Sequence, residues 1–177
     1  MIAQRGLLLA LCVSLAACGT VYRDTDTPMT AQAIDPTRYA GLWYEIARFP
    51  VSFQRGCTAT TAEYGVTGPD TISVVNTCRD ETPDGPVKQV VGSADIEAPG
   101  KLRVRFDSVP FVRAPYWVLW VDEAYDTAVV GVPSGKAGWV LARTPQIPDD
   151  RWQAALSVLR ANGYDTKQLL QTEQPIP

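Results

Sequence analysis

The four cysteines carry the most reactive chemistry in this chain, and they occupy two different contexts. Cys12 and Cys18 belong to an apolar N-terminal stretch, whereas Cys57 and Cys78 lie in the body of the sequence. The chain has no histidine, which removes the commonest general acid–base residue and the commonest metal ligand. The sequence therefore predicts no catalytic residue, no metal site and no cofactor, and it directs attention to cysteine modification and pairing.

The first eighteen residues have the pattern of an export signal. Arg5 gives a positive start, and the apolar run Leu7–Ala17 ends in small residues before Cys18. The run is shorter than the roughly 20 residues that a membrane-spanning helix needs. The ending Leu15–Cys18 resembles the lipobox of bacterial lipoproteins, which implies cleavage before Cys18 and acylation of its thiol. The next residue is Gly19. Lipoproteins retained in the inner membrane resemble one another in having Asp at this position, so Gly19 favours the outer membrane. The alternative is an ordinary secretory signal with an incidental cysteine.

Export also bears on the two remaining cysteines, since an oxidising compartment favours a disulfide. The midpoint between Cys57 and Cys78 falls between Thr67 and Gly68, inside a predicted turn. The two cysteines should then face each other across a hairpin, at a separation close to disulfide reach. Closing a loop of about 20 residues stabilises by roughly 3 kcal/mol in the chain-entropy model. A free, reactive thiol at Cys57 is the alternative.

Length and charge define the class of protein. The chain has 177 residues with 16 basic and 19 acidic side chains, so its formal net charge is −3. A mildly acidic chain without a basic run is a poor nucleic-acid binder. We divide it into a signal peptide (1–17), a polar, aperiodic, lipid-anchored tether (18–33) and one domain (34–177).

The domain shows short β-rich runs separated by turn residues. Residues 101–106 alternate strictly between apolar and charged, as in a strand with one wet face. Eight such runs at regular spacing predict a sandwich or barrel. The expected strands are 43–49, 58–64, 71–78, 88–96, 101–106, 116–121, 127–132 and 139–143.

A single amphipathic helix follows the strands. Asp149 can cap its start, and Asn162 with Gly163 ends it. The apolar stripe should pack on the outside of the sheet, and a short strand is expected at about 167–172. The stripe consists of Trp152, Ala155, Leu156 and Leu159, so Trp152 is interpreted as a packing residue.

Three ordered motifs resemble the signatures of the lipocalin family. Gly41–Arg48 (GLWYEIAR) is similar to the first signature, Ala114–Tyr125 to the second, and Trp139–Pro145 (WVLARTP) to the third. The closing residues Gly163–Asp165 and Gln174-Pro175 are similar to bacterial lipoprotein-type lipocalins and apolipoprotein D. The resemblance covers about residues 35–175.

The resemblance implies an all-β fold, an eight-stranded antiparallel up-and-down barrel with one C-terminal helix packed outside. Such a barrel has no free sheet edge, and its interior holds one small ligand. In the family the motif tryptophan lies at the closed end beneath the motif arginine. Carried over, Trp43 and Arg143 form a structural cation–π lid rather than a binding site.

Strand alternation then gives the side chains expected to line the interior. If Arg143 points inward, so do Leu141 and Trp139. The resemblance to apolipoprotein D suggests that Trp117 and Leu119 point inward too, with Trp120 outside; the opposite parity would exchange the two tryptophans. The expected ligand-binding set is Glu45, Tyr64, Phe106, Trp117, Leu119, Trp139 and Leu141.

Two residues have alternative interpretations. Glu45 shares the parity of Trp43, so it either anchors a ligand head group or pairs with an arginine, because a lone buried carboxylate is costly. Phe111 lies in a connection between strands, where it forms a hydrophobic rim near the mouth or packs in a loop.

The sequence thus predicts an outer-membrane-anchored lipocalin with its domain in the periplasm. It should bind or transport a small hydrophobic ligand, such as a fatty acid or lysophospholipid, in membrane lipid maintenance or stress. The expected partners are that ligand and the membrane, through Cys18. Alternatives are an envelope scaffold protein, a lipid-modifying isomerase that uses a cavity cysteine, and a homodimer that joins two mouths.

Overall fold

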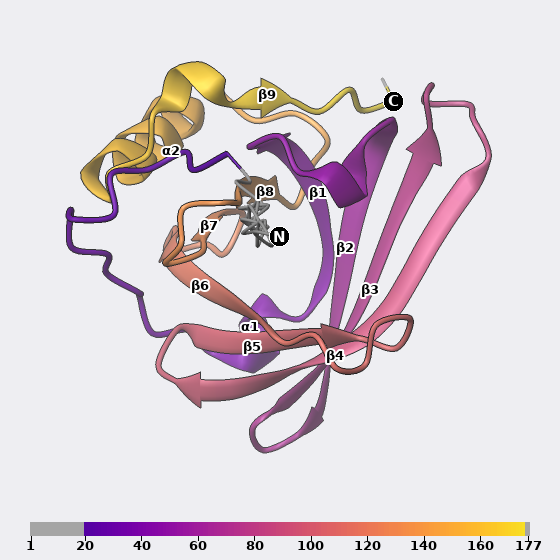
Figure 1. Cartoon of the computed structure of the whole chain (residues 1–177), viewed down its shortest axis with the longest axis horizontal. Helices are drawn as coiled ribbons and strands as arrows, with labels where there is room; N and C mark the ends of the chain where they lie inside the picture. Colours follow the sequence, from indigo (N-terminus) through magenta and orange to yellow (C-terminus); the bar gives the residue numbers. More distant parts are fainter. Residues whose placement is uncertain (1–19, 176–177) are drawn as a thin grey trace, which may run out of the picture.

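The computed structural model describes residues 20–175, and the predicted signal peptide and Cys18 lie outside the described residues. One antiparallel sheet runs in the order β2-β3-β4-β5-β6-β7-β8-β1, and a further β1–β2 pairing closes it into a barrel (Figure 1). The eight barrel strands are β1 (Gly41–Arg48), β2 (Cys57–Gly68), β3 (Thr71–Asp80), β4 (Val87–Ala98), β5 (Lys101–Phe106), β6 (Ala114–Val121), β7 (Thr127–Gly131) and β8 (Gly138–Ala142). The predicted architecture and strand order are confirmed.

Short elements complete the fold. Helix α1 (Pro36–Tyr39) covers one end of the barrel, and its N-cap Asp35 accepts hydrogen bonds from the backbone of Thr37 and Arg38. A 3₁₀ turn, η1 (Ser52–Gln54), lies in the β1–β2 connection at the opposite end. Near the C-terminus, η2 (Thr166–Gln168) and β9 (Leu170–Gln171) replace the single strand expected at 167–172.

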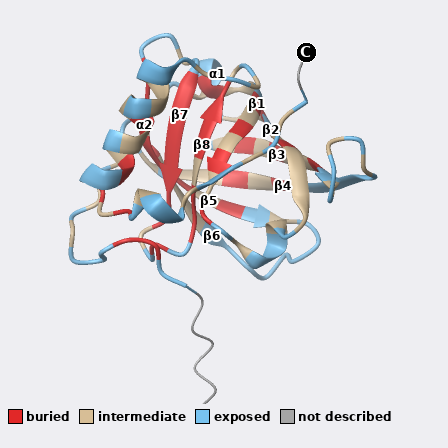
Figure 2. Cartoon of the chain, turned by 90° about the horizontal axis from the view of Figure 1, so that it is seen from above, coloured by how far each residue is buried: buried red, intermediate tan, exposed pale blue. Residues whose placement is uncertain are grey.

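Helix α2 (Asp149–Ala161) packs outside the barrel against β6 and β7, as predicted. Ala155 and Leu159 are fully buried in this contact. Because α2 covers its outer face, β7 is buried along its whole length (Figure 2). The N-cap is Pro148 without a side-chain cap, so Asp149 is the first helical residue, where its charge favours the helix dipole.

The described part of the predicted tether packs on the barrel. Tyr22 is buried, stacks on Phe49 at 5.1 Å between ring centroids and donates its hydroxyl to the Pro50 carbonyl. Arg23 is 7% exposed and pairs with Tyr164 in an isolated β-bridge. Between residues 20 and 33 only Tyr22 and Arg23 are buried, and the outer wall of the barrel rather than a strand partner buries Tyr22. The predicted tether therefore contacts the barrel at Tyr22 and Arg23, and again where the Gln32 amide donates to the Val118 carbonyl.

A disulfide joins Cys57 and Cys78, with a Cα–Cα distance of 5.4 Å. The pairing is confirmed, but the predicted register is not, since Cys57 lies opposite Asp80. A β-bulge between Thr58 and Thr61 shifts the register by one residue and brings Cys57 within reach of Cys78.

The C-terminal segment fills a seam in the barrel wall. Strands β1 and β2 pair only where Gly41–Tyr44 lies opposite Thr61–Tyr64. Beyond that point β9 pairs with the end of β1, and the Ala59 amide donates to the carbonyl of Glu173. Over residues 20–175, no helix has the length and apolar character needed to cross a membrane.

Candidate functional site

The closed end of the barrel is held by an arginine–tryptophan pair. The guanidinium carbon of Arg143 lies 3.8 Å from the centroid of the Trp43 ring, and Trp43 is fully buried. Arg143 also donates to the backbone carbonyls of Arg38, Ala40 and Leu42 at 2.7–2.9 Å. Burial lowers the pKa of Arg143, yet the guanidinium stays charged at every physiological pH. The pair joins α1, β1 and the end of β8, so its geometry is that of a structural lid.

Three tyrosine hydroxyls form a chain above this lid. The Tyr116 hydroxyl lies 2.8 Å from that of Tyr39 and 3.0 Å from that of Tyr64. Burial raises the pKa of Tyr64 to about 12 and raises the pKa values of Tyr39 and Tyr116 well above 10. The hydroxyls therefore stay neutral and can only act as hydrogen-bonding groups at the floor of the interior.

These tyrosines predict a loss of stability in alkali. The unfolded tyrosines ionise near pH 10, whereas native Tyr64 keeps its proton to about pH 12. Stability is therefore complete below pH 10 and falls between pH 10 and 12, by roughly 3 kcal/mol for Tyr64 alone. Urea unfolding across this range should show the fall, and Tyr64→Phe should make it shallower. A slope that is equal in both proteins would exclude Tyr64 as a source.

Aliphatic side chains fill the next layer. Leu141 is 4% exposed, and it belongs to one continuous cluster with the tyrosines. Among the described residues, the lower half of the barrel is thus a packed core rather than an open cup. The cluster also contains Ala62, Ile72, Val74, Ala94, Leu102, Val104, Val118, Val121, Ala128 and Val130.

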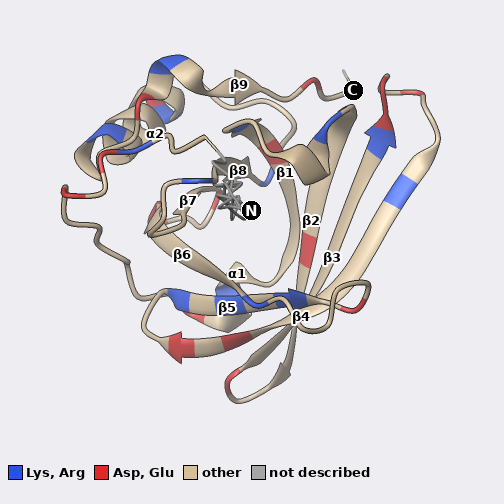
Figure 3. Ribbon diagram, viewed as in Figure 1, with Lys and Arg blue, Asp and Glu red and all other residues tan. Residues whose placement is uncertain are grey.

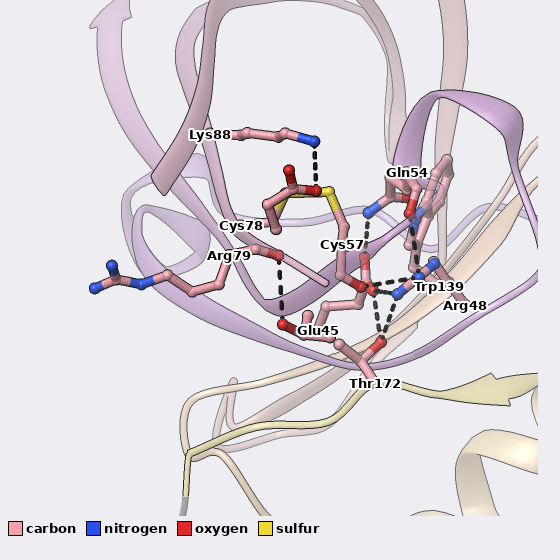
Figure 4. The surroundings of a disulfide bond; sticks show 11 residues. Glu45, Arg48, Gln54, Cys57, Cys78, Arg79, Lys88, Trp139 and Thr172 are labelled. Atoms are coloured by element: carbon pink, nitrogen blue, oxygen red, sulfur yellow. Dashed lines mark hydrogen bonds and ion pairs between the residues drawn. A yellow bond between two sulfur atoms is a disulfide. The ribbon is translucent and has the colours of Figure 1, made fainter. Parts of the chain in front are cut away.

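The upper half is more open and more polar. Phe106 and Trp139 pack on the inner cluster but stay partly exposed. The Trp139 indole donates to Gln54 Oε1 at 3.0 Å, and Gln54 Nε2 donates to Glu45 Oε2 at 2.7 Å (Figure 4). Because Gln54 belongs to η1, the β1–β2 connection folds over the mouth and is fixed to its inner wall.

Glu45 forms a buried ion pair at this level. Its carboxylate is 2.7 Å from Arg48 Nη1, and it accepts a 2.6 Å hydrogen bond from the Thr172 hydroxyl (Figure 4). A bulge between Glu45 and Ala47 turns Arg48 to the same face as Glu45. Of the two roles open from the sequence, the structure therefore shows pairing with an arginine.

Two buried polar atoms on the β2–β3 wall have no hydrogen-bond partner. They are Thr60 Oγ1 and Asn76 Oδ1, and Thr60 is 6% exposed. Asn76 lies opposite Ala62, which belongs to the inner cluster, and Thr60 has the same parity as Ala62. Both side chains therefore face the barrel interior. Unpaired buried polar groups are costly, so each of these atoms is expected to meet a bound polar group or water.

Comparison with known proteins agrees with this geometry. The family model of a lipocalin-like domain matches residues 34–174. This chain belongs to the lipocalin family. It is 34% identical to the outer membrane lipoprotein Blc of Escherichia coli K12 over 143 residues, which cover 80% of each chain. It is 33% identical to temperature-induced lipocalin-1 of Arabidopsis thaliana over 150 residues, covering 81% of each.

More distant likenesses support the same fold. Rabbit (Oryctolagus cuniculus) apolipoprotein D is 32% identical over 157 residues, covering 84% of this lipocalin and 81% of the relative. Lobster apocrustacyanin A1 superposes with a TM-score of 0.66 at 16% identity, covering 85% of this chain and 91% of that one. At that identity the likeness shows the fold alone.

Within this lipocalin the predicted lining residues divide into three groups. Phe106 and Trp139 lie in the open upper half, while Tyr64 and Leu141 lie in the packed part below. Glu45 faces inward but is engaged by Arg48. Each of these five side chains thus belongs to the interior.

The predicted orientation of Trp117 and Leu119 is wrong. Both belong to a second apolar cluster, called here the outer cluster, which lies between the barrel wall and α2 and includes Ala155 and Leu159. The Lys101 ammonium lies 4.0 Å from the Trp117 ring centroid. A bulge between Val118 and Trp120 puts Trp120 on the outer face too, so the two tryptophans do not exchange places. Strand alternation could not show which side chains of β6 face the interior, because β6 is apolar on both faces.

The sequence analysis did not identify four inward-facing polar residues, and it left two roles open for the exposed residue Phe111. Tyr116 and Gln54 come from the second signature and the first loop, where alternation gives no signal. Thr60 and Asn76 could have been found, since each continues the alternation of its strand. Phe111 is 99% exposed, so it forms a hydrophobic rim of the mouth rather than a packed loop.

Proposed function

We propose that this lipocalin is a lipid-anchored binding protein of the outer membrane whose upper barrel holds a small amphiphile, such as a fatty acid or lysophospholipid. Lipocalins bind small hydrophobic ligands. The observation that carries the proposal is the upper interior, whose walls combine the partly exposed aromatic rings of Phe106 and Trp139 with the unpaired polar atoms of Thr60 and Asn76. Such a wall matches a molecule with an apolar chain and one polar group.

The anchor is part of the same proposal. The ending before Cys18 fits acylation, and Blc, a relative of similar length, is named an outer membrane lipoprotein. An acyl anchor confines the domain to a surface that releases poorly soluble lipids. A role in lipid maintenance under stress follows from that location.

Native mass spectrometry of the mature chain tests ligand binding first. The chain should begin at Gly19 rather than inside the N-terminal segment, because Tyr22 and Arg23 are part of the fold. A co-purifying lipid that is lost on denaturation would identify the ligand class. A protein that is empty, and that also ignores added fatty acid and lysophospholipid, would contradict the proposal.

Trp139 should contribute strongly to that binding. Trp139→Ala removes a partly exposed aromatic wall of the upper interior, and we expect about tenfold weaker binding of a fluorescent fatty acid. Trp139→Phe keeps a smaller aromatic ring at this wall and loses the hydrogen bond to Gln54, so its affinity should fall by much less than that of the Ala variant. Equal affinity of the Ala variant and the wild type would place the ligand elsewhere.

A second function deserves a test because the lower half of the barrel is filled. A barrel without free interior volume would serve as a scaffold that docks other envelope proteins. The empty outcome of the mass spectrometry would favour this alternative. The isomerase alternative has lost its nucleophile, since the disulfide to Cys78 consumes the Cys57 thiol. Lipocalins are generally binding proteins rather than enzymes.

A further inference from the structure

A pocket opens at the rim of the mouth and shares Arg48 and Gln54 with the upper interior. It has a volume of about 630 Å³ and lies between the N-terminal segment and the β1–β2 and β7–β8 connections. Its lining is Thr20, Tyr22, Arg48, Pro50, Val51, Ser52, Phe53, Gln54, Arg55, Gly56, Lys136 and Leu170.

The charge of this lining is opposite to that of the chain. The whole chain has a formal net charge of −3, and Figure 3 shows acidic and basic residues spread over many elements. The pocket lining contains three basic residues and no acidic one. Arg48 forms an ion pair with Glu45. Arg55 and Lys136 form no ion pair with any residue between 20 and 175. Two unneutralised cations therefore face one hollow.

The N-terminal segment fixes this pocket close to the predicted anchor. The Tyr22 amide donates to the Gly135 carbonyl at 2.7 Å, and its hydroxyl donates to Pro50 at 2.7 Å, so the segment is held to both loops. Thr20 lines the pocket and is only two residues from Cys18. Two Cα–Cα steps limit their separation to about 7.6 Å. An acyl anchor at Cys18, as the sequence predicts, would therefore tether the pocket close to a membrane surface.

The rim of the pocket suits a lipid surface. Phe53 is 71% exposed and Leu170 is 49% exposed, although both are large apolar side chains. Exposed aromatic and aliphatic side chains next to basic ones are the combination that binds the interface of an anionic bilayer.

We propose that this pocket binds the phosphate of an anionic phospholipid head group, with Arg55 and Lys136 as its ligands and Phe53 inserted beside it. The site turns the mouth of the barrel toward the membrane that holds the anchor. The orientation rests on the proposed function through Cys18, whereas the lipid preference rests only on the pocket.

The test uses the mature chain from Gly19 without its lipid, because the closed barrel, the disulfide and both clusters lie within residues 20–175. Co-sedimentation at low salt compares phosphatidylglycerol-containing vesicles with pure phosphatidylcholine vesicles. The wild type should prefer the anionic vesicles. Arg55→Gln and Lys136→Gln should each lower that binding about fivefold. Lys101→Gln, which removes the same charge at the closed end, should leave it unchanged.

Three results would overturn the proposal. They are equal binding to both vesicles, an equal loss in Lys101→Gln, and binding of inorganic phosphate to the wild type without any retention on vesicles. The last result would mark a site for a free anion. Binding of a fluorescent fatty acid by the Arg55 and Lys136 variants separates this proposal from the proposed function. A wild-type protein that binds anionic vesicles but no fatty acid would contradict only the proposed function.

Discussion

Arg143→Ala should lower the free energy of unfolding by about 4 kcal/mol and leave the intrinsic ligand affinity of the folded protein unchanged. The substitution removes the cation–π contact with Trp43 and leaves the carbonyls of Arg38, Ala40 and Leu42 without their charged donor. Those carbonyls belong to the turn that joins α1 to β1, so the closed end loses its main cross-link. Urea unfolding, followed by tryptophan fluorescence, measures the loss.

Arg143→Lys is the matched control. A lysine keeps the charge over the Trp43 ring but cannot donate to several separate carbonyls from a planar fork, so it should recover less than half of the loss. Fatty-acid binding is measured at a temperature where the Ala variant is folded. A variant of normal stability that no longer binds ligand would show that Arg143 acts in binding, against the structural lid.

The parts of the fold that could be predicted are those that one strand or helix determines by itself. The alternation of residues 101–106 and the apolar stripe of α2 follow from local periodicity, and the structure has both. The three ordered motifs indicated the family, and the resemblance implied the closed barrel and the pairing of Trp43 with Arg143, which the structure has. Local periodicity predicted the single elements, whereas the family resemblance predicted the long-range contacts.

The errors in predicting which side chains face inward arise where a β-bulge interrupts the two-residue alternation of a strand. Bulges in β1, β2 and β6 each shift the parity by one residue, and no residue type in these strands marks the shift. One bulge sends Trp117 and Trp120 to the same outer face, and another brings Arg48 inward beside Glu45. The hydrogen-bond partner of a buried polar side chain is known only once both residues are placed in space. The roles of Glu45 and Gln54 therefore could not be predicted from the sequence.

Glu45→Ala should lower the free energy of unfolding by about 3 kcal/mol, because it leaves the Arg48 guanidinium buried without its counter-charge. The Arg48 side chain is 12% exposed, and its remaining partners are the Thr172 hydroxyl and the carbonyls of Gln54 and Cys57. These neutral acceptors hold part of the charge but cannot replace a carboxylate. Glu45→Gln keeps the shape and the hydrogen bond from Thr172, so it should cost less than Glu45→Ala.

The double variant Glu45→Ala with Arg48→Ala decides whether the pair acts as a unit. Each single change should cost about 3 kcal/mol, whereas the double change should cost about 2 kcal/mol less than their sum, since it leaves no buried charge unpaired. Additive losses would mean that the two residues stabilise the fold independently. The same variants separate stability from function, because Gln54 would lose its contact with Glu45 and free the loop over the mouth. Faster release of fatty acid from Glu45→Gln, at little cost in stability, would then identify that loop as the barrier to ligand exit.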